Sequence, residues 1–310
     1  MSMDVAAIRA EGLTKDYGGG AGLFDLNLEV AAGEVFGYLG PNGAGKTTTI
    51  RLLMDMIRPT RGRAEVFGID CNAHPVQVKR EVGYVPGEMP QWGALRGREV
   101  VAYVAGLRGG ADTGAVSSLA TRLDLDLGRR FRQYSSGNKR KLGLVLAFMH
   151  RPRLLVLDEP TNGLDPLIQQ EFFRMVEEAR EQGSTVFLSS HVLSEVERIC
   201  QRVAILRRGR LVQVARLDEL HQLRYHRIEA DFAGAVPLEA VRACPGVDHV
   251  ASEDHHLSFD VHGSVAPVLQ ALGTGQVLNL VTHEPSLEEV FLAQFRDEPA
   301  GAGVEAGVKA

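Results

Sequence analysis

Several features are scarce or absent in this sequence, and each absence excludes a class of protein. The 310 residues include three cysteines; at positions 71, 200 and 244 they have no disulfide or metal-ligand spacing, which favours a reducing compartment. No apolar run approaches the ~18 residues of a membrane-spanning helix, and residues 1–12 lack the apolar core of a secretion signal. We therefore expect a chain that does not itself cross a membrane.

Charge and composition narrow the class further. The net charge is −5, and basic residues occur only in short clusters, which argues against a nucleic-acid partner. The length allows about two domains, and a hydrophobic content of 45% is enough for two cores.

The most informative segment is the glycine-rich run Gly-Pro-Asn-Gly-Ala-Gly-Lys-Thr at residues 40–47. The apolar residues 35–39 before it are typical of a buried strand, and the spacing of apolar residues from Ile50 to Ile57 predicts a helix after it. A glycine-rich loop between a strand and a helix turns backbone N–H groups toward a phosphate at the positive end of the helix dipole.

This loop predicts a site for a nucleoside triphosphate with its magnesium ion. We expect Lys46 to reach the β and γ phosphates and the Thr47 hydroxyl to lie on Mg²⁺. The residues expected to hold the nucleotide are Asn42, Gly43, Ala44, Gly45, Lys46, Thr47 and Thr48.

Two adjacent acids supply the chemistry that the loop lacks. The apolar run at 154–157 predicts a buried strand that delivers Asp158 and Glu159 to its carboxyl end, where sheets of this kind bind ligands. Asp158 suits the outer shell of Mg²⁺. Glu159 is placed to orient, or take a proton from, the water that attacks the γ-phosphate.

Three further motifs complete an ordered set: Tyr-Ser-Ser-Gly-Asn-Lys-Arg-Lys at 134–141, called the signature below, Asn-Gly-Leu-Asp at 162–165 and Ser-His at 190–191. With the phosphate loop and the Leu-Asp-Glu-Pro segment at 157–160, this order resembles the ATP-binding cassette of ABC transporters. The resemblance covers roughly residues 5–217 and is greatest to the ATPase subunits of ABC-2 type exporters, including those of antibiotic and drug export.

The resemblance implies that two cassettes close head to tail around ATP and Mg²⁺. Ser135 and Gly137, with a helix beginning near Asn138, then face the γ-phosphate held by the other cassette, and Asp165 lies in the segment that contacts that subunit. A side chain at Ser135 is also in the position of an ordinary helix N-cap.

The same resemblance assigns roles within one cassette. Tyr17 matches the aromatic residue that stacks on adenine, and His191 matches the histidine that hydrogen-bonds the γ-phosphate. The expected catalytic set is Glu159, His191 and Lys46.

The sequence departs from the family pattern in the segment that normally supplies a magnesium-sensing glutamine. Gly87 stands in that place, so either Glu88 reaches the metal or water fills the position. Ser136 and Asn138 differ from the usual signature, but Ser135 and Gly137 are present, and we therefore expect a site that hydrolyses ATP.

A helical subdomain is expected at about 87–150, with helices at 98–107 and 115–123. In the family this lobe meets the membrane subunit. An exposed Trp92 beside Pro90 suits that contact, although the segment could instead be a loop packed on its own lobe.

A second domain is expected at 218–296. Strands at 227–232, 248–252, 257–261 and 277–281, with helices at 238–243 and 265–272, give the β-α-β-β-α-β order of a ferredoxin-like fold. Ser286 and Glu289 predict the start of a closing helix, and residues 297–310 suggest a disordered tail.

The expected fold is therefore α/β: an ABC ATPase domain with a mixed sheet and a helical subdomain, followed by a small α+β domain. The expected function is an ATPase subunit of an exporter. It would pair with a second copy of itself or a homologous cassette and act at the cytoplasmic face of the membrane on a separate membrane-spanning subunit. Two alternatives are a soluble ABC protein without a transport role and a regulatory module that binds ATP without cleaving it.

Overall fold

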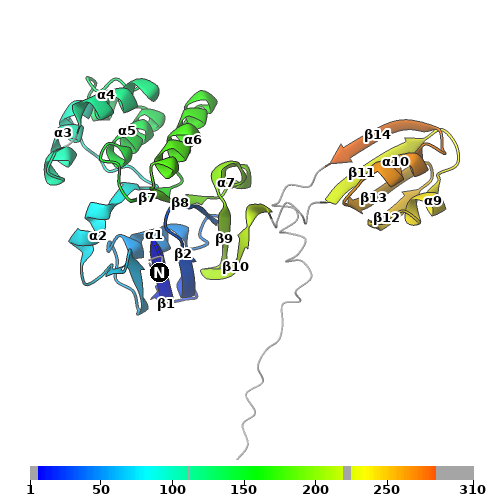
Figure 1. Cartoon of the computed structure of the whole chain (residues 1–310), viewed down its shortest axis with the longest axis horizontal. Coiled ribbons are helices and arrows are strands. Elements are labelled where there is room, and N and C mark those ends of the chain that lie inside the picture. The colour runs from blue at the N-terminus through cyan, green and yellow to red at the C-terminus, as the bar shows by residue number, and fades with distance from the viewer. Residues whose placement is uncertain (1–5, 111, 219–224, 284–310) are drawn as a thin grey trace, which may run out of the picture. The chain divides into compact units, whose positions relative to one another are not determined.

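The computed structural model describes residues 6–110, 112–218 and 225–283. The chain divides into two compact units, Met1–Leu217 and Asp218–Ala310, which are described separately below (Figure 1).

A six-stranded sheet in the order β10-β9-β3-β8-β7-β6 forms the centre of the first unit. The strands from β9 to β6 run parallel, and β10 pairs antiparallel with β9 at one edge. Every residue of β3, β7 and β8 is buried, as expected of strands covered on both faces. The bounds are β3 Val35–Leu39, β6 Val82–Val85, β7 Leu154–Asp158, β8 Thr185–Ser190, β9 Arg202–Arg207 and β10 Arg210–Arg216.

A second, antiparallel sheet in the order β2-β1-β4-β5 belongs to the same unit. Its strands are β1 Ile8–Asp16, β2 Gly22–Val30, β4 Arg61–Val66 and β5 Ile69–Asp70. Apolar residues of β1, β2 and β4 share one buried cluster with residues of β3, β7 and the helix α1 (Lys46–Leu53). This shared core fixes the phosphate loop, which lies between β3 and α1.

Three helices form the helical lobe of the first unit: α3 Gly97–Leu107, α4 Thr113–Arg122 and α5 Ser136–Phe148. Figure 1 shows them gathered beside α6 (Pro166–Glu181). The other helices of this unit are α2 Pro75–Glu81, the 3₁₀ turn η1 Phe131–Gln133 and α7 Leu193–Ile199.

The second unit contains one four-stranded antiparallel sheet in the order β12-β13-β11-β14. Along the chain its elements are β11 Tyr225–Phe232, α9 Leu238–Arg242, β12 Val247–Glu253, β13 His256–His262, α10 Ala266–Leu272 and β14 Val277–His283. Alternate residues of β11 and β13 pack with α9 and α10 in a separate apolar core. The element order is the β-α-β-β-α-β order expected from the sequence.

Some expectations need correction or lie outside the described residues. The helix expected near Asn138 begins at Ser136, because the Ser135 side chain caps it. The expected exposure of Trp92 is wrong: its ring is partly buried and packs edge-on against Tyr103, with 5.9 Å between ring centroids. The expected closing helix at Ser286 and the tail at 297–310 fall outside the described residues. Among residues that are described, no helix is long and apolar enough to cross a membrane.

Candidate active site

The phosphate loop has the backbone geometry that an anion site needs. Gly43 and Gly45 have φ angles of 80° and 109°, a left-handed conformation that only glycine adopts without strain. A Cβ on Gly40 would lie 2.6 Å from the carbonyl oxygen of Leu206, so a larger residue does not fit there. Helix α1 follows with no side-chain cap at Gly45. Its first N–H groups are therefore available to a ligand.

A cavity of about 320 Å³ opens above this loop. Tyr17 and Glu159 line it together with the whole predicted nucleotide-binding loop: Asn42, Gly43, Ala44, Gly45, Lys46, Thr47 and Thr48. Tyr17 is 54% exposed at the rim of the cavity, and Lys15 Nζ lies 5.5 Å from the centroid of its ring. The structure thus brings together the residues that the sequence assigns to one nucleotide.

Glu159 lies between two partners: Lys46, which lines this cavity too, and His191, which is not part of its lining. Glu159 Oε1 is 3.2 Å from Lys46 Nζ, and Glu159 Oε2 is 2.6 Å from His191 Nδ1. Lys46 and Glu159 are largely buried, whereas His191 is about two-fifths exposed. Lys46 begins α1, and Glu159 and His191 directly follow β7 and β8, so these three element ends bring the side chains together.

The backbone at Glu159 is in a rare conformation. Its φ is +50°, in the left-handed region that a non-glycine residue seldom adopts. The Glu159 N–H donates to the Ser189 carbonyl at 3.2 Å and to Ser189 Oγ at 3.1 Å. Local strain of this kind persists only where surrounding contacts enforce it, and it is concentrated at functional sites.

Asp158 is fully buried beside Glu159 and has one oxygen free. Its Oδ1 accepts a 2.6 Å hydrogen bond from Ser189 Oγ. Its Oδ2 is buried and has no hydrogen-bond partner among the described residues. An unpaired buried carboxylate oxygen is costly unless a cation or water approaches it, and hard oxygen ligands are those that Mg²⁺ prefers. The donor set therefore fits a divalent cation.

The residues next to Asp158 define the remaining space at this position. A Cβ on Gly87 would lie 3.0 Å from Asp158 Oδ2, so residue 87 is directly beside the free oxygen. Glu88 is exposed and lines one cavity of about 710 Å³ with Thr47, Gly87 and Asp158. Trp92 lines this cavity too. Glu88 is thus near the expected metal position, but no described contact joins it to Asp158.

The signature residues lie apart from the cavity above the phosphate loop. Ser135 is exposed, and its Oγ accepts a hydrogen bond of 3.2 Å from the Asn138 N–H. A Cβ on Gly137 would lie 2.6 Å from the Gly163 carbonyl oxygen, so the signature packs on the 162–165 segment. Asp165 caps α6 through two backbone N–H groups. Neither Ser135 nor Gly137 lines the phosphate-loop cavity.

The sequence analysis missed two side chains that contact the candidate site residues. Ser189 holds both Asp158 and Glu159, and the register Asp158↔Ser189 between parallel strands places it there. A polar residue at the carboxyl end of an apolar strand was the signal for it. Arg140 is buried at 7% exposure within α5; its spacing from Leu144 and Phe148, which are buried on the same helix, was the signal.

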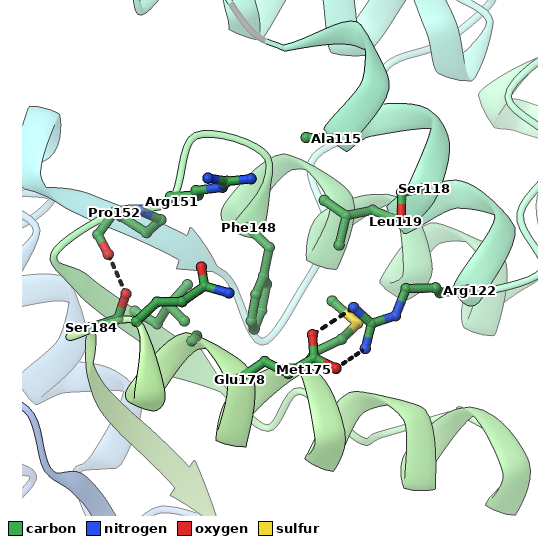
Figure 2. Close-up of a pocket in the computed structure, with 13 residues that line it drawn as sticks. Ala115, Ser118, Leu119, Arg122, Phe148, Arg151, Pro152, Met175, Glu178 and Ser184 are labelled. Atoms are coloured by element: carbon green, nitrogen blue, oxygen red, sulfur yellow. Dashed lines mark hydrogen bonds and ion pairs between the residues drawn. The ribbon is translucent and has the colours of Figure 1, made fainter.

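A smaller cavity of about 150 Å³ lies between α4, the end of α5 and α6. Figure 2 shows Arg122 of α4 directed at Glu178 of α6. The guanidinium lies 2.7 Å from Glu178 and 2.5 Å from Glu171, and these carboxylates raise its pKa. These ion pairs join the helical lobe to α6.

Comparisons with known proteins agree with this geometry. Residues 23–162 match the family model described as "ABC transporter". The chain is 37% identical over 291 residues to the bacitracin transport ATP-binding protein BcrA of Enterococcus faecalis, covering 92% of this chain and 94% of that protein. It is 31% identical to the linearmycin resistance ATP-binding protein LnrL of Bacillus subtilis, covering 92% and 97%.

A solved structure described as the ATP binding subunit of an ABC transporter shares 28% identity with this chain. It superimposes with a TM-score of 0.64 over 69% of this chain and 92% of that one. The chain belongs to the ABC transporter family, as an ATP-binding subunit with ATPase activity.

Proposed function

We propose that this chain is the motor subunit of an ABC-2 type exporter, in which two cassettes pair head to tail and drive efflux through a separate membrane-spanning protein. The observation that carries the proposal is the position of Glu159 between Lys46 and His191 above the phosphate loop. A carboxylate held there is within reach of a water in line with a γ-phosphate.

Lys46, Glu159 and His191 would each have a separate role in ATP hydrolysis. When ATP enters, its phosphates attract Lys46, and the Glu159 carboxylate is then free to orient the attacking water. His191 keeps a ring nitrogen for the γ-phosphate, and Tyr17 stacks on the adenine. The α1 N-terminus and the loop amides stabilise negative charge that builds up on the phosphates.

The free Asp158 Oδ2 and the Thr47 hydroxyl would hold Mg²⁺, with Glu88 as a candidate third group. When bound, the ion neutralises charge on the phosphate oxygens. The Ser189 hydroxyl keeps Asp158 in the orientation that leaves Oδ2 toward the metal position.

The exposed signature supports a composite site. Ser135 and Gly137 lie outside the chain's own phosphate-loop cavity, while the α5 N-terminus presents positive dipole charge. A second copy, or a homologous cassette, would place its γ-phosphate there. The Asp165 segment packs against Gly137 through Gly163 and would lie at the same interface.

The membrane role rests on the relatives, whose names describe transport of bacitracin and resistance to linearmycin. By analogy, the chain would act at the cytoplasmic face of the membrane and export an antibiotic or a drug-like compound. The cavity that contains Glu88 and Trp92 is a candidate surface for the membrane subunit.

The substitution Glu159→Gln tests the catalytic assignment. It keeps the shape of the side chain but removes the charge that orients water, so we expect kcat to fall about 10³-fold, in the range for loss of a general base. ATP binding is retained, and ATP-bound dimers accumulate, as measured by size-exclusion chromatography. The matched control is Glu177→Gln, an exposed carboxylate on α6, which leaves hydrolysis unchanged.

Hydrolysis at the parent rate in Glu159→Gln would show that another group activates the water. The transport role is tested separately by purifying the tagged chain from detergent-solubilised membranes. Recovery with a membrane-spanning protein supports the exporter, whereas recovery with ribosomes would replace it by a soluble ABC protein without a transport role.

A further inference from the structure

Arg140 is a buried cation that has no role in the proposed mechanism of hydrolysis. It lies in α5, one turn after Ser135, and is 7% exposed. Its guanidinium donates to the carbonyl oxygens of Pro86 and Gly87, the latter at 2.6 Å, and lies 3.5 Å from the carbonyl oxygen of Asp158. One side chain thus contacts two segments that are far from it in the sequence.

These acceptors belong to the two strand ends at the expected metal position. Pro86 and Gly87 directly follow β6, and Asp158 ends β7; the two strands pair in parallel, with Val85 opposite Leu157. Three carbonyl oxygens from adjacent strand ends are therefore gathered by one planar guanidinium. Its donors have a fixed fork geometry that an ammonium group lacks.

The electrostatics suit a structural cation at this position. Burial lowers the pKa of Arg140, and the nearby charges of Asp158 and Glu159 act in the opposite direction. Arginine stays protonated in proteins, so its charge-assisted hydrogen bonds to the carbonyl oxygens persist in the low local dielectric.

The hydrogen bond from Arg140 to the Gly87 carbonyl oxygen matters because of the position of residue 87. Residue 87 has no side chain that could fix its segment, yet its backbone is close enough to Asp158 that a Cβ would lie 3.0 Å from the free Oδ2. The position of the 86–88 backbone therefore decides how much space remains beside that oxygen. Arg140 is the described side chain that hydrogen-bonds both segments.

We propose that Arg140 is a positioning residue for the metal site: it fixes the 86–88 segment against the Asp158 end of β7 and connects both to the helix that begins at the signature. This inference rests on the proposed function. It gives the chain a direct link between the helix N-terminus that faces the partner's nucleotide and the carboxylate that serves its own.

The experiment measures metal affinity without turnover. In the Glu159→Gln background, the protein–ATP complex is titrated with Mn²⁺ and bound metal is read by electron paramagnetic resonance. Arg140→Met is expected to weaken Mn²⁺ binding about tenfold or more, as for loss of a group that orients a metal ligand. Arg140→Lys keeps the positive charge but not the fork-shaped guanidinium. Its Mn²⁺ affinity is expected to fall between that of the Glu159→Gln parent and that of the Arg140→Met variant. ATP affinity in EDTA stays unchanged in both variants.

Lys141→Met is the matched control. Lys141 is the next residue of α5 and is also 7% exposed, but its Nζ lies 3.4 Å from the Asp124 carbonyl oxygen, within the helical lobe and away from the metal position. Both substitutions remove a buried cation from the same helix. Only the Arg140 variants should lose Mn²⁺ affinity, and melting temperatures show whether each variant is folded.

Equal Mn²⁺ affinity in the Arg140→Met and Lys141→Met proteins would overturn the proposal and leave Arg140 with a role in folding alone. If Arg140→Met does not fold, Arg140→Lys decides: affinity equal to that of the Glu159→Gln parent overturns the proposal. Failure of the Glu159→Gln parent to bind ATP is a different result, because it removes the proposed function itself.

Discussion

The two helix N-termini assigned to nucleotide differ in how complete they are within one chain. At α1, Lys46, Glu159 and the loop glycines line a cavity, and no side chain caps the helix. At α5, Ser135 is exposed and caps its own helix, and it does not line the phosphate-loop cavity. Under the proposed head-to-tail pairing, the α1 terminus is one half of a composite nucleotide site, and the α5 terminus is the half that a partner's nucleotide would complete. An isolated chain should therefore bind ATP, but hydrolysis should depend on pairing.

The largest effects are expected from substitutions that damage each helix N-terminus separately. Lys46→Ala should weaken ATP binding about 10- to 100-fold, since a hydrogen bond to a charged group contributes about 1.5–3 kcal/mol. Ser135→Arg should leave ATP affinity of the monomer unchanged but abolish nucleotide-dependent dimers through bulk and charge at the partner's γ-phosphate. Calorimetry measures the first effect and size-exclusion chromatography the second.

Mixing the two variants then tests head-to-tail pairing. One composite site combines the intact phosphate loop of the Ser135→Arg chain with the intact signature of the Lys46→Ala chain, so the mixture should trap nucleotide at one site per dimer. Ser117→Arg is the control, because it places the same charge on an exposed position of α4. A mixture that traps no more nucleotide than either variant alone would contradict the composite site.

A smaller effect, on the Mg²⁺ dependence of hydrolysis, is expected at Glu88 beside the expected metal position. Glu88→Ala should raise the Mg²⁺ concentration for half-maximal hydrolysis roughly two- to fivefold, because an exposed charge pair contributes up to about 1 kcal/mol. Gly87→Gln in that background should restore part of the loss. Glu177→Ala, on exposed α6 surface, serves as the control.

If the Mg²⁺ dependence of Glu88→Ala equals that of the parent, Glu88 does not replace the missing glutamine. Water would then complete the coordination, and Arg140 would be the remaining link between the 86–88 segment and the metal position.

The smallest expected change in ATP affinity is at Arg122, which joins α4 to α6. Its side chain is 29% exposed, so its ion pairs are intermediate between fully exposed and buried ones. Arg122→Ala should therefore lower the free energy of unfolding by about 2 kcal/mol, as measured by urea denaturation. ATP affinity should stay at the parent value, since Arg122 does not line the cavity above the phosphate loop. A large loss of ATP affinity would show that the helical lobe and the phosphate-loop cavity are not independent.

Much of the fold followed from local pattern. The apolar runs at 35–39 and 154–157 became fully buried parallel strands, and the strands and helices expected between residues 227 and 281 lie within a few residues of their described bounds. Such patterns report burial on one or both faces of an element, which is a local property. The expected exposure of Trp92 failed because it depends on a contact that is not local. The Trp92 ring packs against Tyr103 of α3, eleven residues away in sequence.

Residue types and their order along the chain specify the chemical groups that this protein can use. A glycine loop ending in Lys46, two acids at a strand end and His191 are specified by residue type and order, because each needs only its own strand, turn or helix to be placed. The tertiary structure decided which of these groups touch. The parallel register of β7 and β8 puts Ser189 on both acids, and the packing of α5 against β6 brings Arg140 to three carbonyl oxygens. These contacts join segments far apart in the chain, so no local pattern could encode them.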